Sequence, residues 1–288
     1  MNNQLIKIWN GKGIVLKKIG FGLSFIVLAI VSYAIYDGVI KAPFIATSNE
    51  YSDEDYDCSI MGINLHGTLW TYIPPQSEDD VFIDKDIVAS EDINYLIKQA
   101  NEDDAIEAIL IEVDSLGGLP VAGEEVANSL KNSEKPTVAV IRQSGLSAAY
   151  WAVTGADYIF ASKNSDVGSI GVTASYLQNV GKNQKDGSDY VQLSSGKYKD
   201  AGDPDRPLTE EERQIFLRDI KIVHQNFIAD VSTNRNIPLT EVEIISDGSS
   251  VLGERAKELH LIDDIGGLRE AEIYLENLTD SKSEVCWY

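Results

Sequence analysis

The chain is poor in cysteine and histidine, with two cysteines, Cys58 and Cys286, and three histidines among 288 residues. No C-x-x-C pair or mixed Cys/His cluster occurs, so we expect neither a metal site nor another cofactor. The cysteines flank the part of the chain after residue 57, and the ends of a domain are often close together. One disulfide could form in an oxidising compartment, but we expect two free thiols.

Positive charge is also scarce, with 24 Lys and Arg against 46 Asp and Glu and a net charge of −22. Four of the lysines lie in the first 18 residues, which contain no acidic residue. The rest of the chain is therefore more acidic still. Such a surface repels nucleic acid and anionic lipid, so we expect no nucleic-acid partner.

The chain has one long run without charge, residues 19–36. Its length approaches the ~20 residues of a membrane-spanning helix. Because lysines precede the run, we expect a single-pass anchor in the cell membrane, with a cytoplasmic segment 1–18 and an extracytoplasmic body. A cleaved signal peptide would have a shorter apolar core and a small-residue cleavage site. A buried core helix fits poorly with a run that is apolar on all sides.

After a polar linker, residues 37–57, the pattern of the body predicts alternating strands and helices up to residue 280 and a tail over 281–288. Such a rhythm is typical of an α/β core with mostly parallel strands and flanking helices. Ser90 is a candidate N-cap, and Thr209 with Glu212 forms a capping box. We expect strands at 63–72, 105–113, 137–141 and 158–161, and helices at 90–100, 121–131, 147–154 and 209–234.

Two strand-to-helix turns carry residues suited to acyl-transfer chemistry. Gly117 and Gly118 follow a predicted strand, where outward N–H groups could hold an oxyanion, but the residues alone favour an ordinary tight turn. Ser147 follows the next predicted strand and begins a helix of small residues. The residues alone favour Ser147 as a helix N-cap over a nucleophile.

The expected base is not a histidine. His66, His224 and His260 lie in predicted strands or helices, so we expect structural roles for them and no Ser-His-Asp triad. Lys197 and Lys199 lie in a loop bounded by glycines. A lysine can act as a base if burial favours its neutral form, but the residues alone favour a solvated basic loop.

Four motifs in this order resemble those of the signal peptide peptidase A family of serine–lysine peptidases. Its fold is similar to that of Clp protease and crotonase. The resemblance covers about residues 60–275. The matching segments are Ser115-Leu116-Gly117-Gly118, Leu146-Ser147-Ala148-Ala149-Tyr150, Gly168-Ser169-Ile170-Gly171-Val172, and the stretch from Gly196 to Pro204.

The resemblance implies a catalytic site shared between neighbouring subunits. Ser147 would be the nucleophile, Lys199 the general base, and Ser169 the residue that orients the lysine amine. Gly117 and Gly118 would offer the oxyanion hole. The family also implies a homo-oligomeric ring, and substrates such as signal peptide remnants near the membrane.

The chain departs from the family pattern at two places. Ala148-Ala149 replaces a glycine pair, so we expect two methyl groups to line the site, and Leu116 replaces the proline of the turn. Lys197 is close to the expected base but lacks the family match. Two other functions remain open: a catalytically inactive membrane-tethered scaffold, and a crotonase-like acyl-thioester enzyme.

Overall fold

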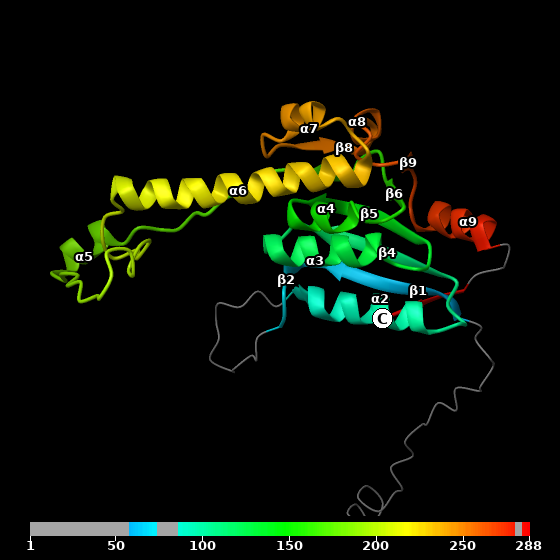
Figure 1. The fold of residues 1–288 in the computed structure, drawn as a ribbon, viewed down its shortest axis with the longest axis horizontal. Coiled ribbons are helices and arrows are strands. Elements are labelled where there is room, and N and C mark those ends of the chain that lie inside the picture. Colours follow the sequence, from blue (N-terminus) through cyan, green and yellow to red (C-terminus); the bar gives the residue numbers. More distant parts are fainter. Residues whose placement is uncertain (1–57, 74–85, 280–283) are drawn as a thin grey trace, which may run out of the picture. The chain divides into compact units, whose positions relative to one another are not determined.

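A computed structural model of the protein describes residues 58–73, 86–279 and 284–288. The core of the described part is a sheet of eight strands, six of which follow the order β10-β1-β4-β5-β6-β9 (Figure 1). Every pair along this path is parallel. The expected α/β core with mostly parallel strands is therefore confirmed. The six strands are β1 Cys58–His66, β4 Ala108–Ser115, β5 Thr137–Leu146, β6 Tyr158–Ala161, β9 Asp264–Ile265 and β10 Glu284–Trp287.

Short strands extend the sheet where β4 and β5 end. β7 (Asp166–Gly168) pairs in parallel with the last residues of β5, and β8 (Ser250–Leu252) pairs antiparallel with β7. β2 (Thr68–Trp70) pairs with β3 (Ile87–Ala89) in a separate two-stranded sheet. β2 also bridges to the glycine turn after β4. The turns that follow β4 and β5 are thus both held by additional strands.

Helices cover both faces of the main sheet, which explains the unbroken apolar run in β4. Ile109 and Ile111 pack into a large hydrophobic cluster with α2, α3, α4 and α6, whereas Leu110 packs with α9 on the opposite face. Parallel strands buried on both faces lose the polar–apolar alternation of half-exposed strands. The helices are α2 Ser90–Glu102, α3 Pro120–Lys131, α4 Ala148–Val153, α5 Val180–Asp186, α6 Glu210–Arg235, α7 Leu239–Ile245, α8 Gly253–Glu258 and α9 Leu268–Thr279.

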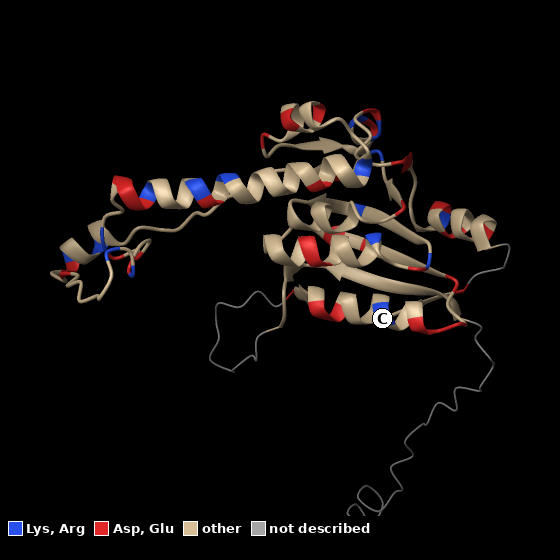
Figure 2. Ribbon diagram, viewed as in Figure 1, with Lys and Arg blue, Asp and Glu red and all other residues tan. Residues whose placement is uncertain are grey.

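Residues 173–209, which we call the arm, contain α5 and lead into α6. Figure 1 shows α5 beyond the N-terminal end of α6, away from the main sheet. Arg206 donates hydrogen bonds to both carboxylate oxygens of Glu212 and to the Asp200 carbonyl oxygen. The predicted capping box of Thr209 and Glu212 is present at the start of α6. The hydrogen bonds of Arg206 thus tie the arm to α6. Charged residues of both signs lie along this end of α6 (Figure 2).

Two local predictions are wrong. Ser90 is the first residue of α2 and not its N-cap, which is Ala89; its hydroxyl donates to Glu125 Oε2 of α3, at 2.5 Å. Residues 284–287, expected in a tail, form β10 at the edge of the sheet. In both cases a partner distant in sequence sets the structure.

The expectation of two free thiols is also wrong. Cys58 and Cys286 form a disulfide, with their Cα atoms 5.8 Å apart. Parallel pairing of β1 with β10 brings them together, and their separation of 228 residues left no local signal.

The predicted anchor, residues 19–36, lies outside the described residues. Among the helices of the described ranges, none is long and apolar enough to cross a membrane.

Candidate active site

Ser147 occupies a tight turn between β5 and α4. Its backbone angles are φ 51° and ψ −126°, outside the ordinary regions for a residue with a side chain. It takes the N-cap position of α4, but its side chain makes no capping hydrogen bond. Its N–H donates to the Gly168 carbonyl oxygen at 2.8 Å, which links the turn to β7. The hydroxyl therefore lies at the turn without capping the helix. Nucleophilic serines of hydrolases occupy strained strand-to-helix turns of this kind.

Gly117 lies directly against Ser147. A Cβ atom on Gly117 would stand 2.7 Å from Ser147 Cβ, and its φ is +114°. Both the close approach and the backbone conformation require glycine. A Cβ atom on Gly118 would stand 1.9 Å from the Leu69 carbonyl oxygen of β2. The two glycines thus allow the turn after β4 to touch both β2 and the serine.

The N–H groups near Ser147 differ in their availability. Gly117 N–H donates to Ser115 Oγ at 3.1 Å, and that hydroxyl donates to the Gly67 carbonyl oxygen at 2.6 Å. Ala148 N lies 3.2 Å from the ideal Cβ position of Gly117. As the first residue of α4, Ala148 has no acceptor for its N–H within the helix. Our sequence analysis missed this donor, although the residue after a serine at a helix start is a general signal for one.

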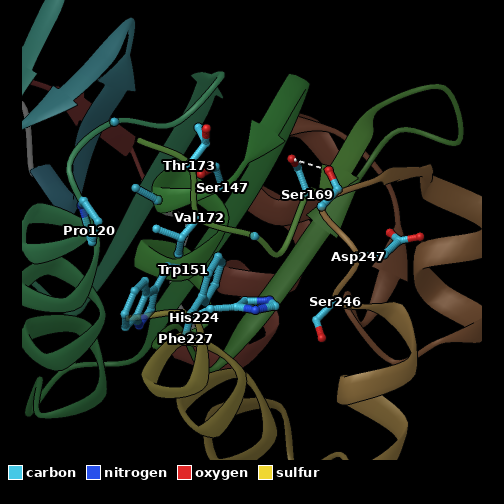
Figure 3. Close-up of a pocket in the computed structure, with 14 residues that line it drawn as sticks. Pro120, Ser147, Trp151, Ser169, Val172, Thr173, His224, Phe227, Ser246 and Asp247 are labelled. Atoms are coloured by element: carbon cyan, nitrogen blue, oxygen red, sulfur yellow. Dashed lines mark hydrogen bonds between the residues drawn. The ribbon is translucent and has the colours of Figure 1, made fainter. Parts of the chain in front are cut away.

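A cleft of about 440 Å³ opens beside Ser147 (Figure 3). It brings Ser147, Ser169 and Gly118 together at one site. Ala148 lines it, but Ala149 is fully buried in the hydrophobic core. The expectation that two methyl groups line the site is therefore wrong. The lining residues are Gly118, Pro120, Ser147, Ala148, Trp151, Ser169, Gly171, Val172, Thr173, His224, Phe227, Ser246, Asp247 and Gly248.

Ser169 has a second strained backbone, with φ 51°. Its Oγ donates to the Gly248 carbonyl oxygen at 2.9 Å (Figure 3). Since this bond uses the hydroxyl proton, the lone pairs of Oγ remain to accept a hydrogen bond.

Lys199 lies on the arm and is exposed. It does not line the cleft, so a single copy of the chain does not bring it to Ser147. Lys197 pairs with Glu211, with Nζ and Oε2 2.5 Å apart. The hydrogen bond to Glu211 raises the pKa of Lys197, which keeps that amine charged and unsuited to accept a proton.

His224, which we expected to be structural, lines the cleft from α6. Its Nε2 is buried and has no hydrogen-bond partner among the described residues, so it makes no bond to Ser147. His66 lies elsewhere, with its Nε2 3.6 Å from Glu112 Oε1. The sequence held no signal for His224, because only the packing of α6 on α4 brings it to the site.

The sequence matches known peptidases over most of the described part. Residues 129–282, more than half of the chain, match the sequence profile of peptidase family S49. A Methanocaldococcus jannaschii protein named, provisionally, as a protease is 34% identical over 67% of this chain and 63% of its own. An Enterococcus faecium protein named, also provisionally, as a signal peptide peptidase is 31% identical over 62% of this chain and 53% of its own. The chain thus spans less than two thirds of either relative.

One solved structure shows the same fold. It is a point mutant of a membrane-bound stomatin-specific protease, with a TM-score of 0.50 and 15% identity. The match covers 80% of this chain and 97% of that one. At this identity the likeness concerns the fold alone.

Proposed function

We propose, on the premise that this chain belongs to peptidase family S49, that it is a membrane-anchored serine endopeptidase with Ser147 as nucleophile. The observation that carries the proposal is the Ser147 backbone, which is strained without capping α4. Its hydroxyl attacks the peptide carbonyl at the cleft and forms an acyl-enzyme, which water then hydrolyses. The chemistry needs no metal or cofactor.

The oxyanion of the tetrahedral intermediate would lie between the turn after β4 and the start of α4. Gly118 is exposed, whereas the Gly117 N–H already donates to Ser115. We therefore assign the donors to the N–H groups of Gly118 and Ala148, and Gly117 provides the room that the approach requires. Each such donor lowers the barrier by about 3 kcal/mol in comparable sites.

The general base would be Lys199 of a second copy of the chain. Within one copy, Arg206 ties the arm to Glu212 at the start of α6, while Phe227 of the same helix stands at the cleft. At 1.5 Å per residue, the helix separates Glu212 from Phe227 by about 22 Å. This rigid spacer keeps Lys199 away from the cleft of its own copy, so its amine is available only to a neighbour.

The surface of the arm supports assembly with other copies. Leu177, Val191 and Leu193 are 89%, 73% and 92% exposed. Exposed large apolar residues gathered on one segment are typical of an interaction surface. We therefore expect a homo-oligomeric ring in which each arm covers, and completes, the site of a neighbouring copy.

Docking of the arm would also create the environment that a lysine base needs. Removal from water favours the neutral amine, which can take the Ser147 proton and later protonate the leaving amine. The Ser169 hydroxyl donates its hydrogen bond to the Gly248 carbonyl oxygen, so its Oγ can accept a hydrogen bond from one N–H of that amine. This contact would turn the amine lone pair toward Ser147.

The substrates would be extended, apolar peptides near the extracytoplasmic face of the cell membrane, such as signal peptide remnants. Leu116, Leu119 and Val121, in and next to the glycine turn, are 75%, 41% and 54% exposed and give the site an apolar rim. The Cys58–Cys286 disulfide supports an extracytoplasmic domain, because disulfides persist in oxidising compartments. The run of residues 19–36 would provide the anchor.

Four variants of the full chain test the dyad. We expect Ser147→Ala and Lys199→Ala to abolish cleavage of a fluorogenic peptide, and Ser147→Ala to abolish labelling by a fluorophosphonate. Lys197→Ala is the matched control and should keep most of the activity, because Lys197 pairs with Glu211. Activity retained in Lys199→Ala but lost in His224→Ala would transfer the role of base to the histidine.

Mixing two inactive variants tests whether the site is shared. Co-assembled Ser147→Ala and Lys199→Ala copies should regain part of the activity, because some sites then combine an intact serine with an intact lysine. Each variant mixed with itself should stay inactive. If wild-type chains are active as isolated monomers, the base comes from the same copy and the shared site is wrong.

A further inference from the structure

A buried hydroxyl, that of Ser115, lies directly behind the glycine turn. Ser115 is the last residue of β4 and is 2% exposed. Its Oγ donates to the Gly67 carbonyl oxygen at 2.6 Å and accepts from the Gly117 N–H at 3.1 Å. Gly67, between β1 and β2, is itself held to β4, because its N–H donates to the Asp114 carbonyl oxygen at 3.2 Å. Ser115 therefore connects Gly117 to a fixed point of the sheet.

A second hydrogen bond holds the other side of Gly117. The N–H of Leu69, a fully buried residue of β2, donates to the Gly117 carbonyl oxygen at 2.9 Å. That oxygen also lies 3.5 Å from Ser115 Oγ, but the hydroxyl proton goes to the much closer carbonyl oxygen of Gly67. The peptide groups before and after Gly117 are thus each fixed by one bond, the first to Ser115 and the second to Leu69.

These bonds determine the direction of the Gly118 N–H. In a trans peptide group, the C=O and the N–H point in opposite directions. Because the Gly117 carbonyl points toward β2, the Gly118 N–H points away from β2. β2 continues from β1, whereas Ser147 follows β5, and β1 and β5 flank β4 on opposite sides. The Gly118 N–H is therefore turned to the side of Ser147, and Gly118 lines the cleft there.

Loss of the Ser115 hydroxyl would leave two backbone groups without their partner, the Gly67 carbonyl and the Gly117 N–H. An unpaired buried backbone group is costly, so the turn would move to find new partners. Glycine allows such a movement, because it has access to many backbone conformations. A rotation at Gly117 would turn the Gly118 N–H away from the cleft.

We infer that Ser115 is a positioning residue of the peptidase, whose hydroxyl orients the glycine turn so that the Gly118 N–H faces the oxyanion. Ser115 does not line the cleft and acts through Gly117. The inference rests on the proposed function, which assigns the oxyanion to Gly118 and Ala148. A donor aimed at the oxyanion stabilises the transition state more than the bound substrate, so its misorientation lowers kcat and leaves KM unchanged.

The kinetic test compares Ser115→Ala with Ser165→Ala in the full chain. Ser165 is the matched control: it is 1% exposed, and its Oγ also accepts a backbone N–H, that of Ser162 at 3.0 Å, and donates to a carbonyl oxygen, that of Arg142. It does not line the cleft. Ser165→Ala should keep kcat and KM within about twofold of wild type, because it removes a buried hydroxyl that does not hold the glycine turn.

In Ser115→Ala, we expect kcat for a fluorogenic peptide to fall at least about tenfold at unchanged KM. Complete loss of one oxyanion donor costs about 100- to 1,000-fold, and a donor that is misoriented part of the time costs less. The Ki of a peptide aldehyde, whose adduct with Ser147 places an oxygen in the oxyanion site, should rise by the same factor as kcat falls. A purely structural defect would instead change KM, or lower the active fraction without changing Ki.

Amide hydrogen exchange of the full chain, resolved to single residues by electron-transfer fragmentation, tests the turn itself. In wild type, the aldehyde should slow exchange of the Gly118 and Ala148 N–H groups and not that of Gly117, which already donates to Ser115. This measurement does not depend on the folding of any variant. In Ser115→Ala without inhibitor, the Gly117 N–H should exchange at least about tenfold faster than in wild type.

The outcomes separate this inference from the proposed function. An unchanged kcat and Ki in Ser115→Ala, or slower exchange of the Gly117 N–H when the aldehyde binds wild type, would overturn the role of Ser115. A wild-type chain that neither cleaves peptides nor binds the aldehyde would overturn the peptidase proposal. In that case, faster Gly117 exchange in Ser115→Ala would still support the orientation of the turn by Ser115, and unchanged exchange would refute it.

Discussion

Gly117→Ala tests whether the turn after β4 positions the nucleophile. The new Cβ atom would stand 2.7 Å from Ser147 Cβ, whereas ordinary van der Waals contact begins at 3.4 Å, so one of the two must move by about 0.7 Å. A shift of 1 Å in a reacting group can lower the rate about 100-fold. The positive φ adds a conformational cost of about 1–3 kcal/mol. We expect kcat/KM to fall about 100-fold while the chain remains folded.

The assay is the rate of fluorophosphonate labelling and of peptide cleavage, with circular dichroism to verify the fold. Two glycines of the arm serve as controls. Gly187 also has a positive φ, +70°, but no atom lies within 4 Å of its ideal Cβ, so Gly187→Ala isolates backbone strain. Gly181→Ala meets neither a close atom nor an unusual φ. A folded Gly117→Ala variant that reacts within threefold of wild type would refute the reasoning.

Two further predictions concern stability. Replacing both cysteines, as C58S/C286S, should lower the free energy of unfolding by about 2–5 kcal/mol in urea titrations, because the disulfide closes a loop of 228 residues; an unchanged midpoint under non-reducing conditions would contradict this. Hydrogen bonds from Arg206 lower the pKa of Glu212 from 4.5 to about 2. The carboxylate therefore stabilises the start of α6 fully above pH 4.5 and loses this effect as pH falls toward 2. Amide hydrogen exchange of this turn, corrected for intrinsic rates, should speed up over that range in wild type and not in Glu212→Gln; equal pH dependence in both would refute the assignment.

Local patterns were sufficient for most of the fold. The strand predicted at 158–161 is β6, and the capping box at Thr209 and Glu212 marks the start of α6, because both depend on neighbouring residues. β5 extends to Leu146, five residues beyond its prediction, because its last residues pair with β7. The strand pairing that joins Cys58 to Cys286 is equally non-local, so spacing in the sequence could not reveal the disulfide.

The candidate site was predictable where its residues lie on strand-to-helix turns, and not where helices meet. Ser147 and the two glycines follow adjacent parallel strands, whose carboxyl ends share one edge of the sheet. His224 reaches the cleft only because Phe227 of α6 stacks on Trp151 of α4. Such a contact depends on how α6 packs, which the apolar pattern of the helix did not specify.

Backbone strain separates the serines that serve the site from residues that only end helices. In the described ranges, four residues other than glycine have positive φ: Ser147, Ser169, Asn236 and His260. Asn236 has φ 53° and ψ 39°, the left-handed conformation that ends α6. His260 directly follows Leu259, the C-cap residue of α8. Ser147 shares the φ but has ψ −126° and leaves α4 uncapped, so helix termination does not account for its strain. Ser169 shares its cleft. The strain that secondary structure leaves unexplained thus lies at the two hydroxyls to which the peptidase proposal assigns the chemistry.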